Sequence, residues 1–168
     1  LSNLTLTQSM GLHDTLSFNM PSWTVSVEFW AYFVFLGMML WMRPTKAWHF
    51  AVIAILIAVN YAVLSTLKPS MDFHYDLGFW RCLGGFFTGV VVARVYRAVV
   101  PMIARWRDTK SVKRTGGIAT LTEVLILTIL VGFVIYMPGK AQFFIAPVAF
   151  IFVLGFAFDL GGVSRFMG

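Results

Sequence analysis

The chain has 168 residues, of which 59% are hydrophobic and only 12% are charged. Soluble domains are roughly half apolar and about a quarter charged, so this composition excludes an ordinary soluble domain and predicts an integral membrane protein. Lysine and arginine outnumber aspartate and glutamate by 13 to 7, which gives a net charge of +6. The single cysteine, Cys82, excludes an internal disulfide and a cysteine metal cluster.

Residues 1–22 carry no basic amino-terminal region and no initiator methionine, so we expect no signal peptide here. The sequence reads instead as an internal piece of a longer chain. The first membrane span is expected at about 23–42. Asn19 is suited to cap this helix, and Pro21 is tolerated near its first turn.

The segment "NMPSWTVSVEFW", residues 19–30, places a carboxylate, Glu28, inside the first span. On a regular helix Thr24, Glu28 and Tyr32 share one face, because they follow one another at intervals of four residues. A second stripe consists of Trp23, Ser26 and Trp30. A charge within hydrocarbon costs about 2.5–3.5 kcal/mol and marks function by default, so we expect the face of Glu28 to be the functional one.

Four further stretches have the roughly 20 apolar residues needed to cross about 30 Å of hydrocarbon. They lie at about 48–66, 78–100, 119–137 and 142–160. The expected fold is therefore all-α: a polytopic integral membrane helix bundle of about five transmembrane helices.

Positive charge is concentrated on one side of the expected spans. That side carries Arg43, Lys46, Arg94, Arg97, Arg105, Arg107, Lys110, Lys113, Arg114 and Arg165. The opposite side carries Lys68, Lys140, Asp14, Asp72 and Asp76. The positive-inside rule then places residues 101–118 in the cytoplasm and residues 1–22 outside. We expect the basic residues to face anionic lipid at the membrane surface, and we expect no nucleic acid partner.

Three ionisable residues lie within the expected spans and a fourth, Asp159, lies at the inner end of the last one. Glu28 and Arg81 fall at similar depths, so they are candidates to pair directly or through a substrate; the alternative is that Arg81 reaches outward alone. We expect Glu123 to meet the basic link before it, and Asp159 to meet Arg165.

Other polar and small residues carry weaker signals. In "GGFFTG" the glycines Gly85 and Gly89 have the spacing that lets another helix approach closely. The histidines lie outside the spans without a shared ligand spacing, so we expect no metal site. For Ser26 a nucleophilic role is open, but the lack of a nearby histidine favours a hydrogen bond to the helix.

Three segments carry a resemblance to a known family. "NMPSWTVSVEFWAYFVF" closely resembles the N-x-P-S-W-S-L-S-V-E-x-W-F-Y segment of the membrane acyltransferase family 3, which contains bacterial O-acetyltransferases of surface polysaccharides. "FWRCLGGFFTGVVVARVYR" is similar to that family's R-x-x-x-x-F-x-x-G-x-x-x helix. "AFIFVLGFAFDLGGVSRFMG" looks like its penultimate segment. The resemblance covers residues 1–168 in the family's order and implies a partial membrane acyltransferase domain.

The resemblance implies a place and an activity for the chain. The family's domain has about ten spans, of which these five would be the fourth to the eighth, in the bacterial inner membrane. The activity implied is transfer of an acyl group, typically acetyl, from cytoplasmic acyl-CoA to a hydroxyl of an exported glycan. The family's catalytic histidine and donor-site arginines would lie in missing parts of the parent chain, so this piece alone is expected to be inactive.

The expected site consists of a catalytic residue, Glu28, and a substrate-binding set. That set is Trp23, Ser26, Trp30, Tyr32 and Arg81. The expected partners are the lipid bilayer, a glycan acceptor and acyl-CoA as co-substrate, with no bound cofactor and no metal. Two other classes stay open: a membrane transporter, for which buried charges also mark a pathway, and a structural membrane subunit.

Overall fold

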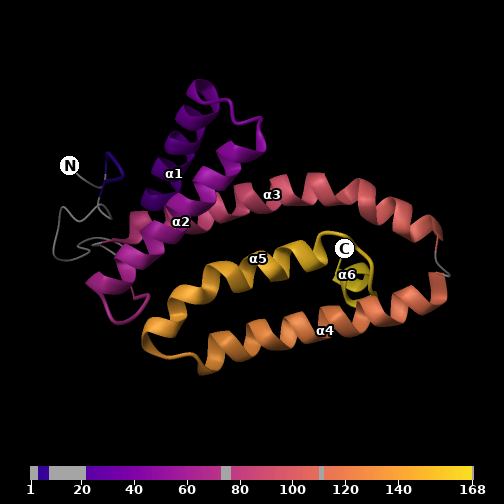
Figure 1. The fold of residues 1–168 in the computed structure, drawn as a ribbon. Coiled ribbons are helices and arrows are strands. Elements are labelled where there is room, and N and C mark those ends of the chain that lie inside the picture. The colour runs from indigo at the N-terminus through magenta and orange to yellow at the C-terminus, as the bar shows by residue number, and fades with distance from the viewer. Residues whose placement is uncertain (1–3, 8–21, 73–76, 110–111, 168) are drawn as a thin grey trace. The chain divides into compact units, whose positions relative to one another are not determined.

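The computed structural model describes residues 4–7, 22–72, 77–109 and 112–167. Within these ranges the regular structure is entirely helical, so the prediction of an all-α membrane helix bundle is confirmed (Figure 1). The elements are α1 (Ser22–Trp41), α2 (Ala47–Leu67), α3 (Gly78–Thr109), α4 (Val112–Tyr136), a 3-10 helix η1 (Gly139–Phe144), α5 (Ile145–Phe156) and α6 (Gly162–Met167).

Five of these segments are long and apolar enough to cross a membrane: Ser22–Trp41, Ala47–Leu67, Gly78–Arg105, Gly116–Tyr136 and Gly139–Phe156. Each overlaps one of the five predicted spans, so the chain is a multi-pass membrane protein. Large apolar side chains along them are exposed rather than packed inside the protein, as lipid-facing residues are.

Two of the spans differ from the predicted ones. The third helix continues to Thr109, and Pro101 lies within it, removing one backbone hydrogen bond without ending the helix. The fifth span begins as the 3-10 helix η1 and becomes α-helical only at Ile145. Pro147 lies in the first turn of α5, where backbone N–H groups have no acceptor within the helix. Its lack of an N–H therefore costs no helical hydrogen bond. The helix then ends at Phe156, before the predicted end at 160.

The chain divides into two compact units, residues 1–88 and 89–168, with α3 contributing to both. In the first unit, α2 and α3 are joined where Asn60 Nδ2 donates to the Trp80 carbonyl at 3.0 Å. The α1 rings of Tyr32 and Phe35 both pack edge-on against Phe86 of α3, with centroids 5.6 and 5.3 Å apart. Three helices are thereby tied together in this unit.

Gly84 is the glycine that permits close approach in the first unit. A Cβ built there would lie 2.8 Å from Asn60 Nδ2 and 3.0 Å from the ring of Tyr61. A Cβ on Gly85 would meet only the Tyr61 hydroxyl, at 3.9 Å, and one on Gly89 meets no described atom within 4 Å. The prediction that Gly85 and Gly89 form the packing surface is therefore wrong for the described residues, because Gly84 points toward α2.

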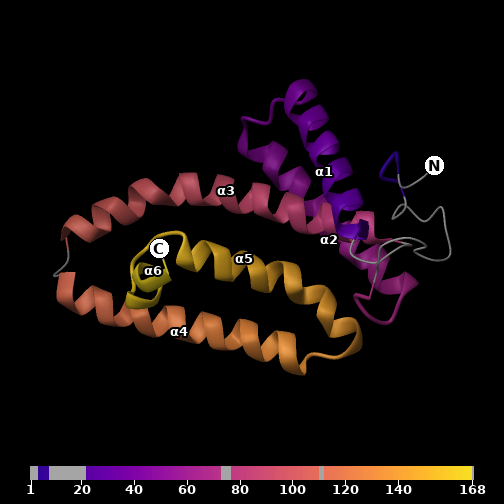
Figure 2. The same cartoon turned by 180° about the vertical axis from the view of Figure 1, so that it is seen from behind.

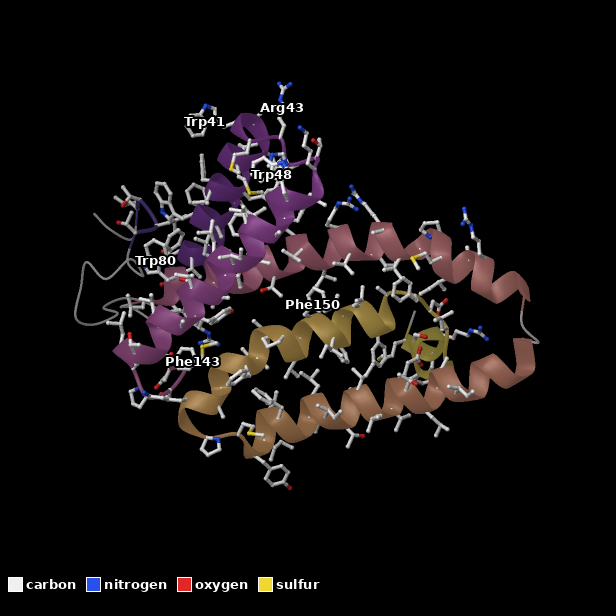
Figure 3. The ribbon with its side chains drawn as sticks, viewed as in Figure 1. Trp41, Arg43, Trp48, Trp80, Phe143 and Phe150 are labelled. Atoms are coloured by element: carbon white, nitrogen blue, oxygen red, sulfur yellow. The ribbon has the colours of Figure 1, made fainter. Side chains whose placement is uncertain are left out.

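Aromatic and basic side chains mark the two ends of the first unit (Figure 3). Trp41, Arg43 and Trp48 gather at the link between α1 and α2, and all three are exposed. Trp80 lies at the start of α3, away from that link, and half of its surface is exposed. Tryptophans favour the two membrane–water interfaces, so the pattern fits a helix hairpin that crosses the bilayer.

In the second unit α4 and α5 lie side by side (Figures 1 and 2). Gly155 of α5 lies against Ile126 of α4, where an added Cβ would be 2.8 Å from the Ile126 Cδ1. The Tyr96 ring of α3 packs on the Phe158 ring beyond α5, with centroids 5.1 Å apart. The short helix α6 packs against α4.

Candidate functional site

The stripe predicted on α1 exists and is accessible. Thr24 and Glu28 are exposed, and Tyr32 has 57% of its surface exposed, all three on successive turns of one regular helix. This stripe begins at the end of α1 that follows residues 1–21. Glu28 therefore presents a carboxylate on the outer surface of a membrane helix, where hydrocarbon contact is unfavourable.

Two neighbouring helices bring further polar groups to the same region. Cys82 of α3 is half-buried and lies within electrostatic range of both Glu28 and Arg81. Arg81 also lies within electrostatic range of Tyr61 of α2, which is buried. Side chains of α1, α2 and α3 thus assemble one polar cluster, which we call the Glu28 cluster: Glu28, Tyr61, Arg81 and Cys82.

Arg81 and Glu28 are not joined directly. Among the described residues there is no ion pair between them; Arg81 Nη1 instead donates to the Met71 carbonyl, in the link before α3, at 3.1 Å. The arginine is half-buried and directed toward that link. Direct pairing is thus not observed, and the outward-reaching alternative agrees with this hydrogen bond, while pairing through a substrate stays a prediction.

Ser26 and Trp30 form a clasp on the opposite stripe of α1. The Ser26 hydroxyl donates to the Leu6 carbonyl at 2.6 Å, and Trp30 Nε1 donates to the same oxygen at 2.9 Å. Leu6 has a left-handed backbone with φ of 53°, and Ser26 is completely buried. We call this arrangement the Leu6 clasp.

The Leu6 clasp gives Ser26 and Trp30 a structural role. Both donors are used by the backbone of residues 4–7, and the Ser26 hydroxyl is covered. Among the described residues, the hydrogen bond to the helix that was expected for Ser26 is not observed, because its hydroxyl donates to a carbonyl 20 residues away. The prediction that Ser26, Trp30 and the half-buried Trp23 contact a substrate stays a prediction.

Among the described residues of the second unit, Glu123 forms an extensive polar site. Only 3% of the residue is exposed. Its Oε1 accepts the Gly161 N–H at 2.8 Å and the Ser164 hydroxyl at 2.6 Å, and its Oε2 accepts the N–H groups of Val163 at 3.0 Å and Ser164 at 3.1 Å.

Thr120, one helical turn before Glu123, completes this site. Its Oγ1 accepts the Gly162 N–H at 2.8 Å while donating to the Gly116 carbonyl at 2.8 Å. All four backbone N–H groups of residues 161–164 are therefore satisfied by two side chains of α4. We call this arrangement the Glu123 clasp.

Among the described residues, neither the expectation for Glu123 nor that for Asp159 is met. The Glu123 carboxylate binds residues 161–164 instead of the basic link, because a buried carboxylate with four donors needs no external cation. Asp159 has a left-handed backbone with φ of 48° and an exposed side chain, and the described residues show no ion pair between it and Arg165. The adjacent glycines in "DLGGVS" are the sequence signal for close backbone approach at this point.

A metal centre has no support in the described part of the chain, which contains no group of three histidine, cysteine, aspartate or glutamate side chains able to hold one. The Nδ1 of His49 accepts the Lys46 N–H at 3.2 Å and so serves the start of α2. His13 and His74 lie outside the described residues.

The fold and the spans define the chain as a multi-pass integral membrane protein. No protein-family model matches the chain. No curated protein and no solved structure matches it either. The resemblance to the membrane acyltransferase family 3 therefore rests on the motifs quoted above, and the activity that it implies is a proposal.

Proposed function

We propose that this chain is part of an integral membrane O-acyltransferase, which moves an acetyl or related acyl group from cytoplasmic acyl-CoA to a hydroxyl of an exported glycan in bacteria. The observation that carries the proposal is the Glu28 cluster. Glu28 is an exposed carboxylate within a membrane helix, and an arginine, a tyrosine and a cysteine from two other helices lie nearby. Helix packing alone does not require such a group of polar side chains within a membrane, which points to a functional site.

The distribution of charge supports an outward-facing acceptor site. Arg43 and Lys46 lie at the link between α1 and α2, far along α1 from Glu28. With that link in the cytoplasm, Glu28 lies in the outer half of the membrane, within about 10 Å of the start of α1 at 1.5 Å per residue. A glycan on the outer side can reach this depth.

Acyl transfer from a thioester to a hydroxyl requires a group that accepts or relays the hydroxyl proton. The acceptor hydroxyl oxygen attacks the thioester carbonyl, the C–O bond forms, the C–S bond breaks, and the hydroxyl proton ends on the departing thiol. Glu28 is suited either to accept that hydroxyl proton or to orient a histidine base contributed by another part of the protein. Arg81 supplies positive charge near the oxyanion that develops on the carbonyl.

The proposal is tested by following a labelled acetyl group in membranes that contain the intact protein. Transfer of label from acetyl-CoA to glycan, lost in Glu28→Gln with normal folded yield, supports it. A matched control is Thr24→Val, one turn away on the same stripe, which removes a hydroxyl but no charge. Movement of an unmodified solute without any acyl transfer would instead identify a transporter.

A further inference from the structure

The turn between α5 and α6 carries an inference that does not depend on acyl transfer. Ala157–Gly161 lie outside the helices, and the Glu123 clasp holds the last residue of this segment, Gly161, against the membrane helix α4. We propose that this turn lies inside the membrane layer and borders water that enters from the basic side of the protein.

The depth of the turn follows from the position of Glu123 along α4. The apolar span of α4 is Gly116–Tyr136. At about 1.5 Å of rise per residue, Glu123 lies about 20 Å from Tyr136 and about 10 Å from Gly116. Hydrogen bonds of 2.6–3.1 Å then hold residues 161–164 at the same level. With a hydrocarbon layer of about 30 Å, the turn is well inside it.

On the side of the turn that faces α4, protein side chains accept the hydrogen bonds of the backbone. Irregular backbone is tolerated at this depth only where protein buries it or water reaches it. Glu123 and Thr120 accept the four N–H groups of residues 161–164, and Gly161 and Ser164 are buried against α4. A Cβ on Gly161 would overlap the Glu123 carboxylate, so the backbone itself is in contact with this side chain.

The other side of the turn carries charge. Asp159 and Arg165 are both exposed, and within the described residues they are not paired with each other. Charges of opposite sign that stay apart and exposed are characteristic of contact with water, whereas hydrocarbon would drive them together or into the protein. Arg165 and the start of α4 lie on the basic side of the protein. Water that enters from this side has a shorter path to the turn than water that enters from the opposite side.

The test places a spin label at position 159 of the intact protein in liposomes. The variant is Asp159→Cys in a Cys82→Ser background, and the matched control is Leu125→Cys, which is close to Glu123 in depth and 59% exposed on α4. Relaxation is measured with oxygen, which partitions into hydrocarbon, and with a neutral nickel chelate, which stays in water.

We expect the label at 159 to respond strongly to the nickel chelate and the label at 125 to respond to oxygen alone. A 159 label that responds only to oxygen faces lipid, and one that responds to neither is buried; both results overturn the proposal. A 125 label that responds to the chelate also overturns it, because that level would then lie outside the hydrocarbon.

The part played by the clasp is tested with the same label. Thr120→Val and Glu123→Gln each remove one oxygen that accepts hydrogen bonds from residues 161–164, so the mobility of the 159 label should rise in both. Thr122→Val, whose hydroxyl bonds only within α4 in the described structure, should leave it unchanged. Equal mobility in all three variants would contradict the assignment of Glu123 and Thr120 as positioning residues.

Discussion

Glu123 and Ser164 are joined by two hydrogen bonds, one from the serine hydroxyl at 2.6 Å and one from its backbone N–H at 3.1 Å, across 41 residues of sequence. This double contact fixes where the chain turns after α5. The carboxylate also accepts hydrogen bonds from backbone N–H groups in the first turn of α6, which have no acceptor within the helix.

Removing the Glu123 carboxylate should therefore destabilise the protein. Glu123→Ala leaves the N–H groups of Gly161, Val163 and Ser164 without acceptors, and each buried unsatisfied group costs about 1–3 kcal/mol. We expect a loss of about 3 kcal/mol or more, and roughly half of that for Glu123→Gln, which keeps one acceptor oxygen. Thermal unfolding in detergent measures both, with Thr122→Val as the control. Equal melting temperatures for all variants would show that the clasp is dispensable.

A side chain at position 161 should have a similar effect for a steric reason. The Cβ of Gly161→Ala would overlap the Glu123 carboxylate, whereas that of Gly162→Ala would lie 3.3 Å from Thr120 Oγ1. We expect Gly161→Ala to cost about 1–3 kcal/mol, as overpacking does, and Gly162→Ala to cost less. Combining Gly161→Ala with Glu123→Ala should cost less than the sum of the two, because they disturb one contact. Full additivity would contradict the overlap.

Packing between α2 and α3 should depend on Gly84. Gly84→Ala places a methyl group 2.8 Å from Asn60 Nδ2 and 3.0 Å from the Tyr61 ring. We expect the folded yield in detergent to fall, with a loss of about 1–3 kcal/mol. Gly89→Ala is the control, since no described atom lies near its Cβ position. A larger loss for Gly89→Ala than for Gly84→Ala would restore the original prediction of the packing surface.

The Leu6 clasp should protect the segment that it holds. Trp30→Phe keeps an aromatic ring but removes the Nε1 donor, and Ser26→Ala removes the other donor to the Leu6 carbonyl. Each lost bond is worth about 0.5–1.5 kcal/mol, so residues 4–7 should be released more often. Faster proteolysis near Leu6 is expected in both variants, while Leu40→Ala, an exposed change near the far end of the same helix, should have no effect.

The orientation is tested by labelling cysteines from one side of the membrane. In a Cys82→Ser background, Asp72→Cys and Arg43→Cys lie at opposite ends of α2. The positive-inside rule predicts that an impermeant reagent added outside labels position 72 and not position 43. Labelling of both positions, or of 43 alone, would remove the outward-facing acceptor site from the proposal.

The five spans were determined by the sequence alone. The free energy of transferring a span into hydrocarbon is a sum over about 20 neighbouring residues, so it can be calculated from the sequence without any tertiary contact. The stripe of Thr24, Glu28 and Tyr32 follows in the same way from the period of the helix.

Only the tertiary structure decided which polar groups meet. Glu123 bonds to residues 38–41 positions away, and Ser26 and Trp30 bond to Leu6. Gly84 lies closer than Gly85 to Tyr61. Each of these depends on which helices pair and on how each is rotated about its axis. A one-residue change of register turns a helix by about 100°, and no local period of the sequence specifies that rotation.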